Sequence, residues 1–165
     1  MTSGQSGGSG TDFATARGRD WPSVRQFNVF LENRVGALLE LVRRFESTDV
    51  AIISISIIDT ADCAIIRLVL SDPERGYELL KSAKLMFTES DLVVVGLPSG
   101  SQPILKICKT LLSAEIGIDY AYSLLASTDG DRALALHVED HETAVQLLTK
   151  SGFRVYSEQD LNERS

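Results

Sequence analysis

The chain of 165 residues contains one internal repeat, and this duplication limits the folds that it can adopt. The segment "LVLSDPERGYELLKSAK" (68–84) aligns with "LHVEDHETAVQLLTKSG" (136–152) at an offset of 68 residues. Further along, "FTESDL" (87–92) aligns with "YSEQDL" (156–161) at an offset of 69. A period of about 67 residues is too long for a solenoid repeat and indicates two copies of one small domain.

The first copy predicts the element order βαββαβ. Apolar alternation over 25–31 and β-branched runs over 50–58 and 64–70 predict three strands. A helix is expected after the first strand, where apolar residues recur at helical spacing. Asp72 before Pro73 predicts the start of a second helix, and "LMFT" (85–88) supplies a last, short strand.

The second copy follows the same order. Strands are predicted over 92–97, 117–125 and 132–138, with a short last strand in "FRVYS". Asp140 is expected to cap the second helix, which ends at Gly152. Asp129-Gly130 predicts a hairpin turn that holds the extra residues of this copy.

The predicted fold class is α+β, with two tandem ferredoxin-like units whose antiparallel sheets carry helices on one face. The predicted domains are a disordered tail (1–22), a first unit (23–91) and a second unit (92–161). In "AIISISII" we place Ile53, Ile55 and Ile57 on one face of a strand and Ile52 and Ile58 on the other. Both faces are therefore apolar, and the second unit is expected to cover the face that the helices leave open.

Charge and composition weigh against several classes of partner. The net charge is −7 and the pI about 4.8, so binding to nucleic acid or to an anionic membrane surface is not expected. No apolar run is long enough to span a membrane, and the first residues lack a signal-peptide core. Cys63 and Cys108 have no metal-ligand spacing and fit a reducing, cytoplasmic compartment. We expect no cofactor.

The catalytic inventory is small, and we predict that the protein is not an enzyme. No nucleophile-elbow, phosphate-loop or zinc-protease motif is present. Two minor alternatives stay open. His137 and His141 could share a metal, although their spacing spans an element boundary, and Arg34 with Asn33 could hold a phosphate.

The first strand and the segments around it carry a family resemblance. The strand is followed by "LENRVGALLEL", in which Asn33 and Gly36 stand three residues apart, and "FESTDVAI" leads into the next strand. With "AEIGIDYAYSLLAS" (114–127) in the second copy, this pattern resembles the ACT domain family over about 27–161. The resemblance implies a regulatory module of amino-acid metabolism that binds a free amino acid between a first β–α turn and a strand of a neighbouring domain.

The residues of the turn suggest how such a ligand is held. With Asn33 as N-cap and Gly36 near the third helical position, free amides and the positive end of the helix would favour a carboxylate. Gly36 would leave room for close approach. Glu32 or Asp119 would receive the ammonium group. The expected ligand-binding residues are Glu32, Asn33, Arg34, Val35, Gly36, Leu38, Asp119, Tyr120 and Tyr122.

The second copy departs from this pattern, because Gln102 takes the position of Gly36. We therefore expect one functional turn in each chain, facing the "IDYAY" strand of the second copy. The expected partners are a free amino acid, a second copy in a homodimer, and a metabolic enzyme that receives the signal. The alternative is a structural oligomerisation protein that has lost ligand binding.

Overall fold

The computed structural model describes residues 22–125 and 131–162. The predicted tail, apart from Pro22, and the predicted turn at Asp129-Gly130 lie outside the described residues. The elements are β1 (Val24–Glu32), α1 (Ala37–Arg43), β2 (Ile52–Asp59), β3 (Cys63–Leu70), α2 (Pro73–Ser82), β4 (Met86–Gly96), α3 (Pro103–Leu112), β5 (Ile118–Ser123), β6 (Ala133–Val138), α4 (His141–Lys150), β7 (Val155–Tyr156) and α5 (Glu158–Asn162).

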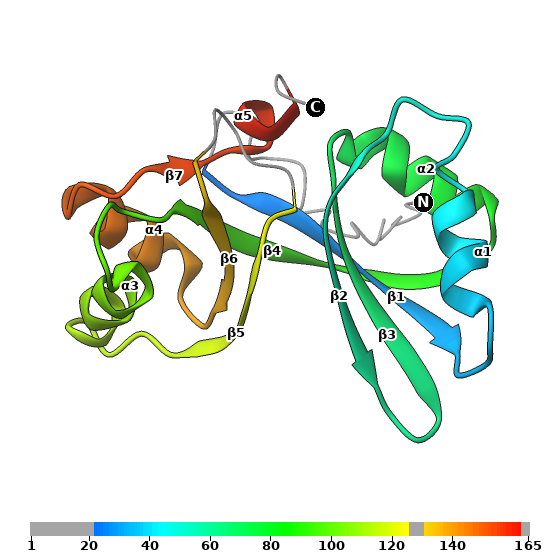
Figure 1. Cartoon of the computed structure of the whole chain (residues 1–165), viewed down its shortest axis with the longest axis horizontal. Helices are drawn as coiled ribbons and strands as arrows, with labels where there is room; N and C mark the ends of the chain where they lie inside the picture. The colour runs from blue at the N-terminus through cyan, green and yellow to red at the C-terminus, as the bar shows by residue number, and fades with distance from the viewer. Residues whose placement is uncertain (1–21, 126–130, 163–165) are drawn as a thin grey trace, which may run out of the picture.

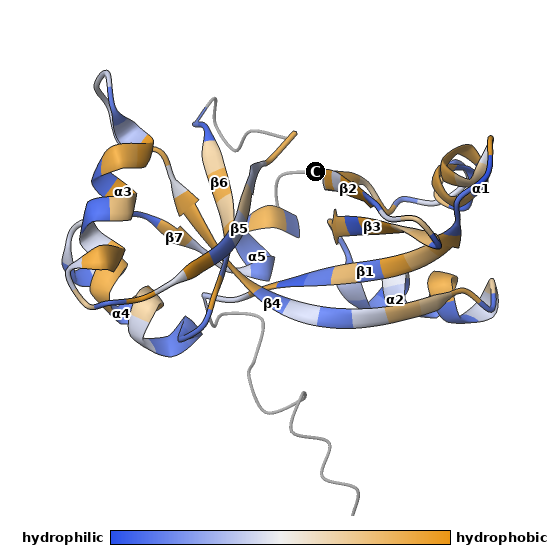
Figure 2. Ribbon diagram, turned by 90° about the horizontal axis from the view of Figure 1, so that it is seen from below, coloured by the Kyte–Doolittle hydropathy of each residue, from blue (hydrophilic) through white to orange (hydrophobic). Residues whose placement is uncertain are grey.

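One strand, β4, belongs to both units. Its first half pairs with β1 in the order β4-β1-β3-β2, and its second half lies between β7 and β6 in the order β7-β4-β6-β5. All pairings are antiparallel, which confirms the predicted α+β class of two ferredoxin-like units. The separate strands predicted over 85–88 and 92–97 form one strand, because the polar residues between them include no Gly or Pro to turn the chain. Figure 2 shows this polar middle between apolar ends.

The two units pack with their sheets inside and their helices outside (Figure 1). Each unit has its own core between its sheet and its helices. A third apolar cluster joins Ile53 and Val69 of the first unit to Ala133 and Ala135 of the second. Two hydrogen bonds cross the same boundary, from Ser54 Oγ to the carbonyl of Ser123 at 2.7 Å and from the amide of Leu125 to the carbonyl of Ile53 at 2.8 Å. The prediction that the second unit covers the open face of the first is confirmed.

The predicted faces of β2 are wrong for the residues after its bulge, including Ile55 and Ile57. A bulge between Ile52 and Ser54 adds a residue to β2, so Ile52 and Ile55 both pack on the core of the first unit, while Ile53 lies on the face between the units. A bulge shifts every later residue to the opposite face, and the alternating sequence gives no sign of it.

The helix starts and ends predicted from capping residues are confirmed for α2 and α4. The carboxylates of Asp72 and Asp140 accept hydrogen bonds from the amides of Arg75 and Thr143. Gly152 follows α4 with a φ of +84°, the left-handed conformation in which glycine carries no penalty. The short helix α5 was not predicted.

Candidate functional site at the first β–α turn

The turn between β1 and α1 differs from the prediction at its two key residues. Gly36, with a φ of +88°, is the N-cap of α1, and it makes no side-chain capping bond because it has no side chain. The Asn33 side-chain amide instead donates to Asp59 Oδ1 at 2.8 Å and to the carbonyl of Thr60 at 3.4 Å. The predicted roles of Asn33 as N-cap and Gly36 near the third helical position are therefore wrong. Asn33 ties the turn to the β2–β3 hairpin.

The space around Gly36 is open, as predicted. An atom placed at the Cβ position of Gly36 would have no neighbour within 4 Å, and the adjacent Val35 is fully exposed. Leu38 is half-buried and packs on the core of the first unit rather than facing this space. Val35 and Leu38 therefore point to different surroundings and do not form one apolar wall.

Arg34 folds back over the first turn of α1. Its guanidinium donates two hydrogen bonds to the carboxylate of Glu40, at 2.9 and 2.5 Å, and its Nε lies 3.4 Å from Glu32. The hydrogen bond to Glu40 raises the pKa of Arg34, and the hydrogen bond from Arg34 lowers the pKa of Glu40, with a smaller lowering from Arg44. Both charges therefore persist at neutral pH, and the pair forms a fixed polar wall.

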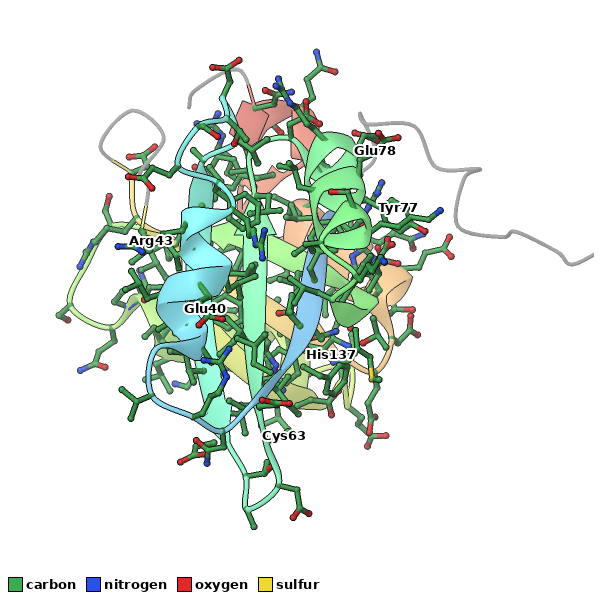
Figure 3. All side chains as sticks on the ribbon, turned by 90° about the vertical axis from the view of Figure 1, so that its right-hand side faces the viewer. Glu40, Arg43, Cys63, Tyr77, Glu78 and His137 are labelled. Carbon is green, nitrogen blue, oxygen red and sulfur yellow. The ribbon has the colours of Figure 1, made fainter. Side chains whose placement is uncertain are left out.

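Beside this pair lies a pocket of about 310 Å³, at the lower end of the range for small-molecule sites. The end of β1, the inner face of α1 and the segment that enters β4 surround it. Phe30, Leu31, Ala37 and Leu41 give it an apolar floor, and charged side chains of both signs stand around it. Its charged residues are Glu32, Arg34, Glu40, Arg44 and Lys84. Figure 3 shows α1 from the side, with Glu40 labelled.

The predicted residues of the second unit lie elsewhere. The hydroxyls of Tyr120 and Tyr122 hydrogen-bond to the side chain of Gln26, at the start of β1. Since six residues of extended strand separate Gln26 from Glu32, the tyrosines and the turn are roughly 20 Å apart. Within one chain, the turn therefore does not face the "IDYAY" strand, and that expectation is corrected.

The tyrosines belong to a polar junction between the units. Gln26 is fully buried and bridges the two hydroxyls, while Arg67 lies 3.5 Å from the centre of the Tyr120 ring. Burial raises the pKa of Tyr122 well above its usual value. The other face of the Tyr120 ring stacks on His137. These contacts pair the hydroxyls of Tyr120 and Tyr122 with the side chain of Gln26 and give the two tyrosines a structural role.

Strict alternation along β5 would place Asp119 on the opposite face from Tyr120, but the structure places it elsewhere. A bulge between Ile118 and Tyr120 turns its carboxylate to His137 Nδ1, at 2.7 Å. His141 lies apart from this pair, with Nε2 3.3 Å from the carbonyl of Leu92. In the described ranges no three His, Cys, Asp or Glu side chains are grouped as a metal site would need.

Sequence reasoning included Glu32 and Arg34 but missed Glu40, Arg44 and Lys84. Glu40 and Arg44 lie one helical turn apart on α1, so the helix pattern could have placed both on one face with the turn. Lys84 reaches the pocket because β4 pairs beside β1, with Met86 opposite Phe30. Only the register of that pairing brings Lys84 close, and the register could not be known from one sequence.

The equivalent turn of the second unit is built differently. Gln102 is the N-cap of α3 and makes no side-chain capping bond, and Pro103 follows it. The Lys106 ammonium donates to the carbonyl of Ser99 at 3.2 Å and lies 3.5 Å from the Cβ position of Gly100. A glycine with a positive φ therefore caps α1 whereas a glutamine caps α3, so the two turns are not equivalent.

Comparison with known proteins gives the family and the fold. Residues 22–164 match the family described as an ACT domain pair, and no curated protein matches the chain. The crystal structure of protein BT0572 from Bacteroides thetaiotaomicron is 22% identical, with a TM-score of 0.77 over 86% of this chain and 96% of that one. The ligand-free regulatory subunit of aspartate kinase from Thermus thermophilus is 13% identical, with a TM-score of 0.52 over 78% and 91%. None of the helices in the described part is long and apolar enough to cross a bilayer.

Proposed function

This chain belongs to the family of ACT domain pairs, and we propose that it is a regulatory protein that binds a free amino acid beside the first β–α turn. The pocket next to α1 is the observation that carries the proposal. It has the size of a small-molecule site, an apolar floor, and both signs of charge at its rim. A zwitterion needs such a pair of opposite charges, because its carboxylate and ammonium must each replace the water that they lose.

The charged residues suggest an orientation for the ligand. The exposed Glu32 carboxylate, which lines the pocket, suits an ammonium group. The cations Arg44 and Lys84, from the end of α1 and the segment before β4, suit a carboxylate. The Arg34–Glu40 pair forms the wall between them and stays neutral as a unit. α1 has only seven residues, so its dipole is a minor contribution and side chains supply the charge.

A regulatory role without catalysis fits the relatives. The Thermus thermophilus protein of the same fold is named a regulatory subunit of aspartate kinase. By analogy, we propose that this chain responds to its ligand by contact with a partner, either a metabolic enzyme or a second copy. Cys63 and Cys108 are both free thiols, which supports a reducing, cytoplasmic location.

Isothermal titration of the purified chain against the twenty amino acids tests the proposal. At least one amino acid should give saturable heat, and Arg34→Gln should weaken that binding, because Glu40 is then left unpaired at the pocket wall. Arg75→Gln is the matched control. Arg75 is also a half-exposed arginine near the start of a helix, but its ion pair, with Asp49, involves no residue that lines the pocket.

Saturable binding that Arg34→Gln weakens and Arg75→Gln spares would support the proposal. No heat with any amino acid, on protein whose circular dichroism shows the expected helix and strand, would overturn it. That result would favour the alternative of a structural oligomerisation protein, for which fully exposed Val35 and half-exposed Ile57 offer apolar contacts.

A further inference from the structure

We propose that the ligand of the pocket beside α1 is an acidic amino acid, one whose side chain carries a second carboxylate. This inference rests on the proposed function, since it names the class of ligand for the same pocket. Three cationic and two acidic side chains line the pocket, which leaves one positive charge in excess. An amino acid with a carboxylate side chain has a net charge of −1 at neutral pH, so it matches this excess.

The excess charge is concentrated on two residues. Arg34 is paired with Glu40 through two hydrogen bonds, and its Nε also lies near Glu32. In the part of the chain that the structure describes, neither Arg44 nor Lys84 forms an ion pair with an acid. Both cations line the pocket, Arg44 from the end of α1 and Lys84 from the segment before β4, so an anion in the pocket would be attracted to both. A single α-carboxylate can contact both cations but balances only one of their two charges, and a second carboxylate balances the other.

The backbone at Lys84 supports a role for its side chain. Lys84 follows α2 in the left-handed conformation, with a φ of +55°, which costs a residue with a side chain about 1 kcal/mol or more. The repeat supplies the comparison, because the residue 68 positions later is Gly152, at the same place after α4 and with a φ of +84°. The second unit therefore has the residue suited to this conformation, whereas the first unit carries a strained lysine that lines a pocket.

A neutral ligand would leave this wall uncompensated. An amino acid with an amide side chain has the same shape but offers no charge to the second cation. A basic amino acid would add a third positive charge and be repelled. The pocket should therefore distinguish an acid from its amide. We expect the acid to bind about tenfold more tightly, which is the effect of one hydrogen bond to a charged group.

Titration at low ionic strength, where exposed charges are least screened, tests the inference with matched ligands. Aspartate and glutamate are compared with asparagine and glutamine. We expect one acid to bind about tenfold more tightly than its own amide. Lys84→Gly should lower the affinity for the acid about tenfold while the protein is as stable as before or more so, because glycine relieves the left-handed strain.

Two control variants separate the pocket from general effects of charge and strain. Glu115→Gly relieves the same strain at a φ of +56° outside the pocket, and it should leave binding unchanged. Arg44→Gln should weaken binding of the acid, whereas Arg43→Gln should not, since Arg43 precedes Arg44 directly but lines a different pocket, with Val42 and Phe45.

The outcomes distinguish this inference from the proposed function. If an amide or another neutral amino acid binds as tightly as the acids, or if Lys84→Gly leaves the affinity for the acid unchanged, the acidic ligand is excluded while amino-acid binding stands. If no amino acid binds to the folded protein, both proposals fail.

Discussion

At the scale of single residues, the junction between the units depends on whether buried polar groups are paired. The side chain of Gln26 is fully buried and accepts a hydrogen bond from the hydroxyl of Tyr122. Tyr156 lies in the same cluster, yet its buried hydroxyl makes no hydrogen bond with the described residues. The hydroxyl of Tyr122 is therefore expected to stabilise the fold, whereas the hydroxyl of Tyr156 is not.

Removing the hydroxyl oxygen of Tyr122 or of Tyr156, one at a time, tests this account. Tyr122→Phe should lower the free energy of unfolding by about 1–2 kcal/mol, because it removes the hydroxyl that donates to the buried side-chain oxygen of Gln26. Tyr156→Phe should be neutral or stabilising, because it removes a hydroxyl that is already unpaired. Urea unfolding followed by circular dichroism measures both. Equal losses in the two variants would contradict this account of the junction.

Residue-scale reasoning from sequence succeeded where the signal is local. Asp72 and Asp140 cap their helices because an Asx side chain needs only the next three residues to do so. Asn33 has the same chemistry but was misassigned, because Asp59 lies on a hairpin that comes close only in the folded chain. Of the charged residues that line the pocket, Glu32 and Arg34 were predicted. Lys84 was missed because it is distant in sequence from the turn.

At the scale of elements, the spacing of apolar residues predicted which segments are strands and which are helices. It failed to predict the faces of strands at their bulges. The register shifts after Ile52 and after Ile118 moved Ile55 and Asp119 to the opposite side from the one that alternation assigns. Bulges arise from how a strand twists against its partners, which a single strand's sequence does not encode.

The cap of α4 makes a prediction about pH. Hydrogen bonds from the Thr143 hydroxyl and amide lower the pKa of Asp140 below its unfolded value of about 3.9. The stability that this cap gives is therefore complete above about pH 4 and is lost as the pH falls through the folded-state pKa. Asp140→Asn keeps an acceptor but does not titrate, so its urea midpoint should fall less between pH 6 and about pH 3 than that of the unchanged protein.

Asp62→Asn controls for the loss of one negative charge, since Asp62 is an exposed acid in the turn after β2. The two asparagine variants are compared over the same pH range. If they change the midpoint by the same amount, the effect belongs to net charge and the capping account is wrong.

At the scale of the whole molecule, the two units are bound together by more than surface contact. They share β4 and bury a common cluster that includes Ile53, Val69 and Ala135. Units of roughly 70 residues bury a smaller fraction of their unfolded surface than larger domains do and are marginal alone. The repeat predicted two units and their mutual packing, but not the shared strand, because a duplicated sequence suggests two separate copies of every strand.

This coupling can be measured by a change confined to one core. Leu80 is fully buried in the core of the first unit, so Leu80→Ala should lower the free energy of unfolding by about 2–5 kcal/mol. We expect the units to unfold together, so amide hydrogen exchange in β6 of the second unit should accelerate by the same free energy as in β3. Unchanged protection in β6 would show that the units open independently.

Because β4 is continuous, its register in one unit also fixes its register in the other. Phe87 on this strand faces one helical layer, and Val93 and Val95 face the other. If β4 slipped by one residue along β1, every side chain on it would invert, and the valines would leave their core while the pocket beside Lys84 was reshaped. Neither half of β4 can change its register alone, so a shift of register in one unit would be transmitted to the core of the other.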